Sequence, residues 1–401
     1  MPLALLLCLA TAAAAPEERD DPPREPILEA PIDLNGWHFA GVPLVAFGSD
    51  VGLTIGAALF FYRSIEGHPN AQRSATLGFS YATRGPRSLD LTLGGERLLD
   101  LPLASSINIH VGDDDQMPYW GEGARLGGLP TPPGFGSPPE PYRYHDRRIF
   151  TSWWARVNLL GPLGVHLRAR YLDVDVAGPS GLLLASRPSG LRGGRVALGE
   201  AGLVYDSRDR GVGTRHGVFL SAAAFAAPQL DGVSDFSFHG YDAAARVYLP
   251  LWPGAALATR ALYDRKIAGV PGRRAAPAAE AVPFFERTLY EGIAYNEGLG
   301  GYGTVRGIAR YRLAGDEKVL GNVQLRVNIL TTHLAGKAQE WGVGAGVDAG
   351  WARQPGFEAV DAAGAAVGLR FIWDRTILLR IEMGRTRGGD DTLYIAFGDM
   401  F

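Results

Sequence analysis

The chain has 401 residues, of which 20% are charged, and its formal net charge is -3. This nearly neutral balance implies no polyanionic partner, so nucleic acid is not expected as a ligand. The only cysteine is Cys8. It lies in the leader discussed next, so the mature chain is expected to have no disulfide, no thiolate catalysis and no cysteine metal site.

Residues 1–15 predict a secretory signal peptide, because Leu3 to Ala15 form a short apolar run that ends in small residues. The run is too short to span a bilayer as a helix, and no later window holds 18 consecutive apolar residues. Residues 16–36 are rich in proline and acidic side chains and predict a periplasmic linker. The folded part is therefore expected at residues 37–401.

Residues 37–401 alternate between apolar and polar side chains. In KVLGNVQLRVNIL, Val319, Val323 and Val327 alternate with polar residues such as Asn322 and Gln324. Such alternation fits either a soluble sandwich or a membrane barrel that turns its apolar face to lipid and its polar face to the lumen. In EWGVGAGVDAGWAR, Trp341 and Trp351 share one face. At an ordinary strand rise and tilt they are separated by about 25 Å along the barrel axis, the height of a lipid-facing band. The spacing favours the membrane barrel.

We predict an all-β fold, a transmembrane antiparallel barrel of about sixteen strands. The strands are expected near 38–48, 51–64, 72–84, 87–98, 103–112, 142–160, 163–175, 195–207, 215–227, 235–249, 254–267, 316–331, 337–351, 361–373, 376–386 and 392–401. The longest connections follow the fifth, seventh and eleventh strands, whereas the connections after even-numbered strands include short turns. This is the layout of an outer-membrane barrel with both termini on the periplasmic side.

The chain ends in LYIAFGDMF, so we expect Phe401 to lie inside the last strand. Outer-membrane barrels commonly end in this way. Phe397, Gly398 and Phe401 are therefore interpreted as a signal that the barrel assembly machinery reads during insertion.

Four motifs resemble the bacterial surface antigen superfamily, the BamA/TamA-type barrels and two-partner-secretion transporters. VRGI at 305–308 is similar to the Val-Arg-Gly-aromatic signature of the loop between strands eleven and twelve, with Ile308 in the aromatic position. YDSRDRGVGTRHGVFLSA, GVDAG and FGDMF resemble three further signatures, and the likeness runs from about residue 37 to the end. Family members with known partners carry periplasmic POTRA domains before the barrel. The segment between signal and barrel has no room for one.

The resemblance implies that the long extracellular loop folds back into the lumen and that Arg306 pairs with Asp348. The sequence supports this independently. Asp348 falls on the inward face with Gly346 and Gly350, and glycines leave room for another backbone. We therefore predict a lock made of Arg306, Gly307, Asp348, Gly346 and Gly350. The alternative is an exposed loop arginine without a fixed partner.

Other motifs favour less specific interpretations. GLGGYG, Gly298 to Gly303, satisfies a dinucleotide-binding pattern but lacks the strand before it and the helix after it. His166, His239 and His333 lack ligand spacing and are expected in the lumen or at interfaces. Asp113 to Asp115 are either a solvated loop or a divalent-cation site at the lipopolysaccharide surface. The inward arginines either select anions in a pore or pair with lumen acids such as Asp173 and Glu382. They are Arg156, Arg168, Arg170, Arg326 and Arg370.

We expect a protein of the outer membrane of a Gram-negative cell, in contact with outer-membrane lipid and lipopolysaccharide. The resemblance implies translocation or insertion of protein or lipid, with a periplasmic partner supplying the missing domains. A passive pore or structural barrel is the alternative, and a lipid-modifying barrel enzyme is the third reading. We expect no enzyme activity, metal or cofactor.

Overall fold

The computed structural model describes residues 33–34, 37–65, 68–95, 103–124, 139–179, 181–209, 213–290, 298–334, 337–373, 377–387 and 391–401. The expected signal peptide, and the linker apart from residues 33–34, lie outside these ranges. Within the described ranges, no helix is both long enough and apolar enough to cross a membrane.

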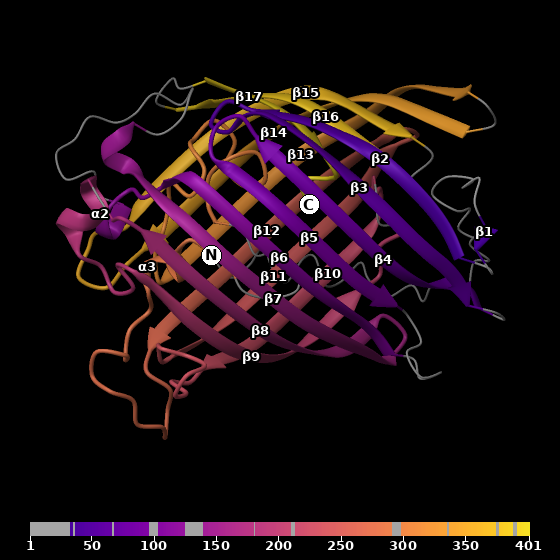
Figure 1. The fold of residues 1–401 in the computed structure, drawn as a ribbon. Coiled ribbons are helices and arrows are strands. Elements are labelled where there is room, and N and C mark those ends of the chain that lie inside the picture. The colour runs from indigo at the N-terminus through magenta and orange to yellow at the C-terminus, as the bar shows by residue number, and fades with distance from the viewer. Residues whose placement is uncertain are drawn as a thin grey trace, which may run out of the picture.

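The described strands β2 to β17 form one closed antiparallel barrel, as the alternation predicted (Figure 1). Each strand pairs with the next in sequence, and β17 pairs with β2. A short strand, β1 (Asp33–Leu34), pairs with the start of β2. The barrel strands are β2 (Trp37–Gly48), β3 (Gly52–Ile65), β4 (His68–Ala82), β5 (Pro86–Gly95), β6 (Leu103–Pro118), β7 (Arg143–Leu160), β8 (Leu163–Ala177), β9 (Gly193–Asp206), β10 (Gly217–Ala227), β11 (Phe238–Trp252), β12 (Ala255–Ala268), β13 (Glu317–Leu334), β14 (Lys337–Arg353), β15 (Val360–Trp373), β16 (Ile377–Thr386) and β17 (Asp391–Phe397).

The long connections follow β6, β8 and β12 and gather at one end of the barrel. They carry the 3-10 helices η2 (Glu122–Ala124) and η3 (Glu140–Tyr142) and the helices α2 (Gly181–Ser186) and α3 (Phe284–Arg287). Figure 1 shows α2 and α3 at this same end of the barrel. Because the strand number is even, β2 begins and β17 ends at the opposite, short-turn end.

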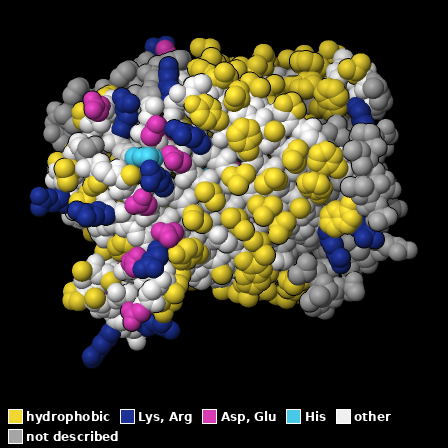
Figure 2. Space-filling view, viewed as in Figure 1, with side chains coloured by type: hydrophobic (Ala, Val, Ile, Leu, Met, Phe, Trp, Pro, Cys, Tyr) yellow, Lys and Arg dark blue, Asp and Glu magenta, His cyan; other side chains and the backbone are white. Residues whose placement is uncertain are grey.

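The outer face of the barrel is apolar and the inner face is polar. On β13, Val323 is 41% exposed whereas its neighbours Asn322 and Gln324 are almost fully buried. On β14, Val347 is 58% exposed and Asp348 only 2%. Figure 2 shows the resulting broad hydrophobic band, bordered by charged side chains on the side of α2 and α3. A soluble sandwich buries its apolar face, so this arrangement is that of a barrel surrounded by lipid.

At the end that carries the helices, the inner face of the barrel becomes apolar. Leu172, Val174 and Val176 of β8 are buried there against Phe284 and Phe285 in one hydrophobic cluster. The polar residues of this stretch point outwards instead, and Asp173 is wrongly predicted as a lumen acid because it lies on this outer face. The alternation itself continues. What changes is the medium outside, because the strands here extend beyond the apolar band.

Several strand ends differ from the prediction by a few residues, and two of these differences change the placement of predicted site residues. β6 continues to Pro118, so Asp113 to Asp115 belong to a strand rather than to a solvated loop. β17 ends at Phe397, and Phe401 is not in the strand. Gly398 has a φ of 84°, which turns the chain, and Met400 and Phe401 are buried beyond that turn. The prediction took FGDMF as strand because the chain ends on an aromatic residue, as outer-membrane barrels commonly do.

We expect Val347→Arg to lower the free energy of unfolding by about 2–4 kcal/mol, because it places a charge near the middle of the lipid-facing band. The control is Leu334→Arg at the end of β13, where the same charge reaches water and the cost falls to about 0–1 kcal/mol. Denaturant titration of the refolded protein in lipid bilayers measures both. Equal costs at the two positions would contradict a lipid-facing exterior.

Candidate functional site: a buried ion-pair network inside the barrel

Arg306 is the centre of a buried network on the inner face of the barrel. Its Nε and Nη2 atoms donate to the two carboxylate oxygens of Asp348 at 2.8 and 3.0 Å, and its own backbone N–H donates to Asp348 Oδ2 at 3.1 Å. Its Nη1 donates to Glu382 Oε1 of β16 at 3.0 Å. Arg306 is 1% exposed and Asp348 2%. The structure therefore brings the two predicted residues together in a bidentate pair.

The wall strands complete the network around this pair. Arg380 donates to Glu382 at 2.6 Å, and Asn322 donates to Asp348 Oδ1 at 2.8 Å and to the carbonyl oxygen of Thr304 at 2.7 Å. Each carboxylate therefore accepts bonds from more than one donor, which offsets the cost of removing charges from water. Burial alone would lower the pKa of Arg306, but the hydrogen bond and charge of Asp348, with Glu382, outweigh it and raise that pKa. Arg306 is thus charged at every physiological pH.

Arg260 of β12 links the Arg306 segment to the C-terminal segment 398–401. Its Nη2 donates to the carbonyl oxygen of Gly303 at 2.7 Å and its Nη1 to that of Met400 at 2.9 Å. The Phe401 ring lies against the guanidinium groups of Arg260 and Arg326, at 4.8 and 5.1 Å from its centroid. Segments that start at opposite ends of the barrel therefore meet on one side chain.

Asp399 anchors the same C-terminal segment to the wall. It accepts hydrogen bonds from Arg370 Nη2 at 2.7 Å and from the backbone N–H of Gly213 at 2.9 Å. Burial alone would raise the pKa of Asp399, but the charges of Arg326 and Arg370 outweigh it, so the pKa lies below the ordinary value. A lowered pKa stabilises the fold above the unfolded value, near 3.9. The anchor is therefore lost only in strong acid.

Glycines allow the Arg306 segment to approach the wall. A Cβ on Gly346 would lie 3.0 Å from Arg306 Nη2, and one on Gly350 would lie 2.9 Å from the Val305 side chain. Two closer contacts were not predicted: a Cβ on Gly364 of β15 would lie 2.1 Å from the Arg306 carbonyl oxygen, and one on Gly384 of β16 would lie 2.8 Å from the Gly307 nitrogen.

Gly307 itself has a φ of 100°, a conformation that favours glycine. A Cβ there would lie 2.8 Å from the backbone of Arg385, so both the backbone conformation and the space require glycine. Ile308, in place of the aromatic of the resembling signature, is 9% exposed and packs in a hydrophobic cluster with Val305, Leu299 and Leu313. An aliphatic residue therefore fills this position without a ring.

The other predicted inward arginines are paired, but not with the acids suggested by the sequence. Arg168 pairs with Glu200 at 2.6 Å, Arg170 with Glu286 of α3 at 2.8 Å, and Arg156 approaches Asp206 at 3.6 Å. Arg326 and Arg370 share Asp399. Glu382 is bound by Arg306 and Arg380 instead. Partners from α3 and from the C-terminal segment are not predictable, because neither follows the strand alternation.

The residues of the remaining motifs make ordinary structural contacts in the described part of the chain. His166 bonds Glu200 at 3.1 Å, His239 bonds the Gly269 carbonyl oxygen at 2.6 Å, and His333 is exposed at the end of β13. Gly298 to Gly303 are followed by turns rather than by the helix that a dinucleotide fingerprint needs. Asp114 is bound by Arg310 at 2.6 Å. Across the described ranges, no cluster of three or more His, Cys, Asp or Glu is placed to hold a metal.

The seam between β17 and β2 is the weakest pairing in the barrel and lies beside the network. Only two residue pairs join these strands, Tyr394 with Gly48 and Ile395 with Phe47, whereas seven join β16 to β17. At its start, β2 pairs with β1 through Trp37 and His38. One edge of β2 pairs with β3, and the other edge pairs with β1 and β17. On this second edge, the stretch 39–46 has no partner strand within the described part of the chain.

Solved structures support the family resemblance at the level of the fold. BamA from Haemophilus ducreyi lacking POTRA domains 1-3 matches with a TM-score of 0.58 and 14% identity, over 91% of this chain and 70% of that one. CdiB from Escherichia coli matches with a TM-score of 0.54 and 11% identity, over 91% of this chain and 63% of that one. The barrel has the fold of these proteins. No protein-family model matches the sequence, and no curated protein matches it.

We expect Arg306→Ala to destabilise the protein by about 3–5 kcal/mol, because it leaves the buried Asp348 without a cation. Asp348→Ala should cost less, since Glu382 still pairs with Arg306. The double variant should cost less than the sum of the two single changes. Denaturant unfolding of all four forms gives the coupling energy. Arg306→Lys should keep only part of the stability lost in Arg306→Ala, because an ammonium group lacks the planar fork of a guanidinium. Strictly additive costs would show that the two residues do not interact.

Gly364→Ala should release the Arg306 segment, because the new methyl group meets the Arg306 carbonyl oxygen. Overpacking of this kind costs about 1–3 kcal/mol. Limited proteolysis of the segment 298–316, with unfolding measured in parallel, tests the effect. Gly321→Ala on β13 is the control, since a Cβ there meets no atom within 4 Å. Equal protease resistance of the two variants would mean that the close contact is not needed.

Proposed function

We propose that this barrel inserts or translocates protein at the outer membrane by opening the seam between β17 and β2. The observation that carries the proposal is the free edge of β2 at 39–46, on a strand that faces lipid. Unpaired main-chain groups in lipid cost several kcal/mol each unless another strand pairs with them. An incoming strand would supply those partners by β-augmentation.

The composition of β2 supports the same function. Pro43 lies in the middle of the free edge and has no N–H to donate. Proline is tolerated in a strand at an edge and disfavoured where a ladder is complete. With Pro43 on β2, the strand can close with β17 only through a shorter ladder. Val45, at 54% exposure, keeps the strand lipid-facing.

The contents of the barrel disfavour the alternative, a passive pore. The Arg306 segment and the C-terminal segment both contact inner-face side chains, and the hydrophobic cluster around Phe284 and Phe285 adds further packing at the end that carries the helices. A water-filled channel is lined by free polar groups rather than by such contacts.

The proposal places the protein in the outer membrane of a Gram-negative cell with both termini in the periplasm. The connection that carries Arg306 then enters the lumen from the cell surface. Outer-membrane lipid and lipopolysaccharide surround the hydrophobic band, and the assembly machinery inserts the barrel through Phe397, Gly398 and Phe401. BamA and CdiB share the fold, and a periplasmic partner protein is expected by analogy with the family.

A disulfide across the seam should block the function. In a Cys8→Ser background, Phe47→Cys with Ile395→Cys places two thiols at paired positions of β2 and β17, within disulfide reach. Proteoliposomes carrying the oxidised variant should no longer accelerate insertion of a urea-unfolded outer-membrane barrel. Insertion is measured as the fraction of substrate that migrates fast on unboiled gels. Reduction should restore the rate.

Leu220→Cys with Tyr205→Cys is the matched control, because it crosslinks β10 to β9 away from the seam. Oxidation of this control should leave insertion unchanged. If the oxidised seam variant works as well as its reduced form, opening of the seam is not required. Large, steady conductance of the unaltered protein in planar bilayers would instead support the pore.

A further inference from the structure

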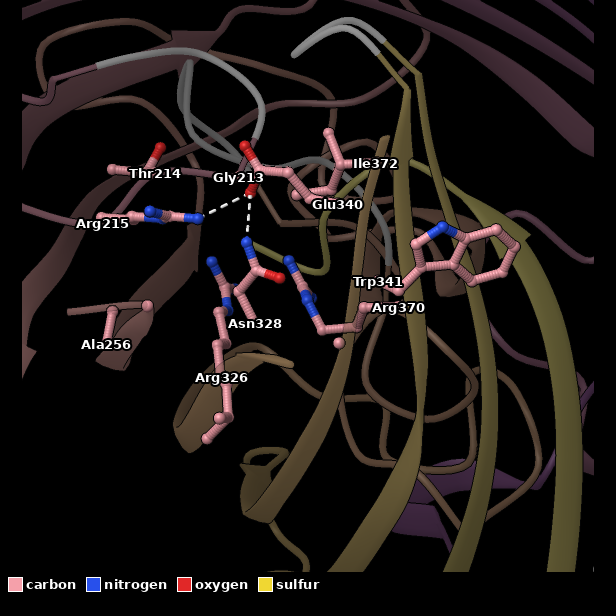
Figure 3. Close-up of a pocket in the computed structure, with 13 residues that line it drawn as sticks. Gly213, Thr214, Arg215, Ala256, Arg326, Asn328, Glu340, Trp341, Arg370 and Ile372 are labelled. Atoms are coloured by element: carbon pink, nitrogen blue, oxygen red, sulfur yellow. Dashed lines mark hydrogen bonds and ion pairs between the residues drawn. The ribbon is translucent and has the colours of Figure 1, made fainter. Parts of the chain in front are cut away.

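A pocket lined by three arginines lies at the short-turn end of the barrel, which is the end away from α2 and α3. Arg326 of β13 and Arg370 of β15 come from the wall, and Arg215 comes from the segment 213–215 before β10. Figure 3 shows their guanidinium groups around the side chains of Asn328 and Glu340. The pocket adjoins the Arg306 network, because Gln324 bonds both Arg326 of the pocket and Glu382 of the network.

Acidic groups hold part of each arginine side chain in the pocket. Arg215 donates to Glu340 at 2.6 Å, and Asn328 donates to the same oxygen at 3.3 Å. Arg370 donates to Asp399 at 2.7 Å, and Arg326 lies 3.4 Å from the same carboxylate. Three arginines thus share two side-chain carboxylates, and Arg326 also donates to a main-chain oxygen of Phe401, the last residue, at 3.1 Å. Asp399 also accepts a hydrogen bond from the backbone N–H of Gly213, which itself lines the pocket.

Two buried donors in the pocket have no partner. Arg326 Nη1 and Arg370 Nη1 make no hydrogen bond with the described residues, although each side chain is at least nine-tenths buried. Their other nitrogens are used: Arg326 Nε bonds Gln324 at 3.0 Å and Arg326 Nη2 bonds the Phe401 carbonyl oxygen at 3.1 Å. A buried donor without an acceptor costs free energy, more so when it is charged. The pocket therefore has free guanidinium donors for an acceptor-rich anion.

We propose that this pocket binds a phosphate-class oxyanion between Arg326 and Arg370. Guanidinium groups match phosphate oxygens in two-point geometry, and a phosphate has enough acceptors for the two free Nη1 donors and for Arg215 together. Asn328 Oδ1 is also unpartnered and accepts a hydrogen bond from a protonated phosphate oxygen. The anion is either free phosphate from solution or the phosphate of a lipid headgroup at the membrane surface.

Such a ligand would also tighten the barrel at its seam. Arg326 and Arg370 hold Asp399 and Phe401, which follow directly from β17. An anion that orders these two arginines therefore orders the C-terminal segment. This inference does not depend on the proposed transport role, since it concerns binding and local order only.

Isothermal titration calorimetry of the detergent-purified protein tests the site with two probes, inorganic phosphate and glycerol 3-phosphate, at constant ionic strength set with chloride. We expect saturable binding of at least one probe with a stoichiometry of one. Preference for glycerol 3-phosphate would assign a lipid headgroup, and preference for inorganic phosphate would assign the free ion. Absence of saturable binding of both probes would overturn the proposal.

Arg370→Gln should weaken this binding by at least about tenfold, because it removes a charged donor. Arg353→Gln is the matched control: it removes the same charge from an exposed pair with Glu317 at the far end of β14 and should leave affinity unchanged. Fast migration on unboiled gels verifies that each variant is folded. Arg326→Gln replaces Arg370→Gln if the latter does not fold. Equal affinity of the folded pocket variant and the control would refute the assignment.

Discussion

Everything in this molecule follows from the absence of water around a sheet in lipid. A strand in hydrocarbon has to pair its main-chain groups on both edges, so the sheet closes on itself. Closure fixes two faces of opposite character, and the alternation of β13 and β14 reflects that division residue by residue. The seam at β2 and β17 departs from complete pairing, and the main functional proposal is drawn from this departure.

On the inner face the constraint is the cost of removing charges from water, because charged side chains there are enclosed by protein. Arg306 and Asp348 are more deeply buried than a water-filled lumen would leave them. A charge in that position has to be paired several times over. Asp348 accordingly accepts bonds from Arg306 and Asn322, and Glu382 accepts them from Arg306 and Arg380. Because several donors must meet each carboxylate at once, the Arg306 segment satisfies these bonds in one position only.

The strands could be predicted from the sequence because lipid imposes a period of two on every one of them. The Arg306–Asp348 contact could be predicted from the motifs and from the glycines on β14. The contacts of Gly364 on β15 and Gly384 on β16 could not be, since a single glycine in a strand looks like any other small residue until a neighbour is placed against it. The turn at Gly398, the apolar inner surface near α3 and the partners of the inward arginines depend on contacts distant in sequence. No local pattern encodes them.

The position of the C-terminal segment bears on how the seam is held. Main-chain bonds between β17 and β2 are few, so the ladder alone holds the edge weakly. The residues after β17 are instead bound by side chains on the inner face of other strands. Arg380 of β16 holds the Gly398 carbonyl oxygen at 2.8 Å, Arg370 of β15 holds Asp399, and Arg260 of β12 holds Met400. Side-chain bonds from these interior arginines therefore hold the end of β17 where main-chain bonds to β2 are few. Any ligand or substrate that rearranges those arginines acts on the seam without touching it.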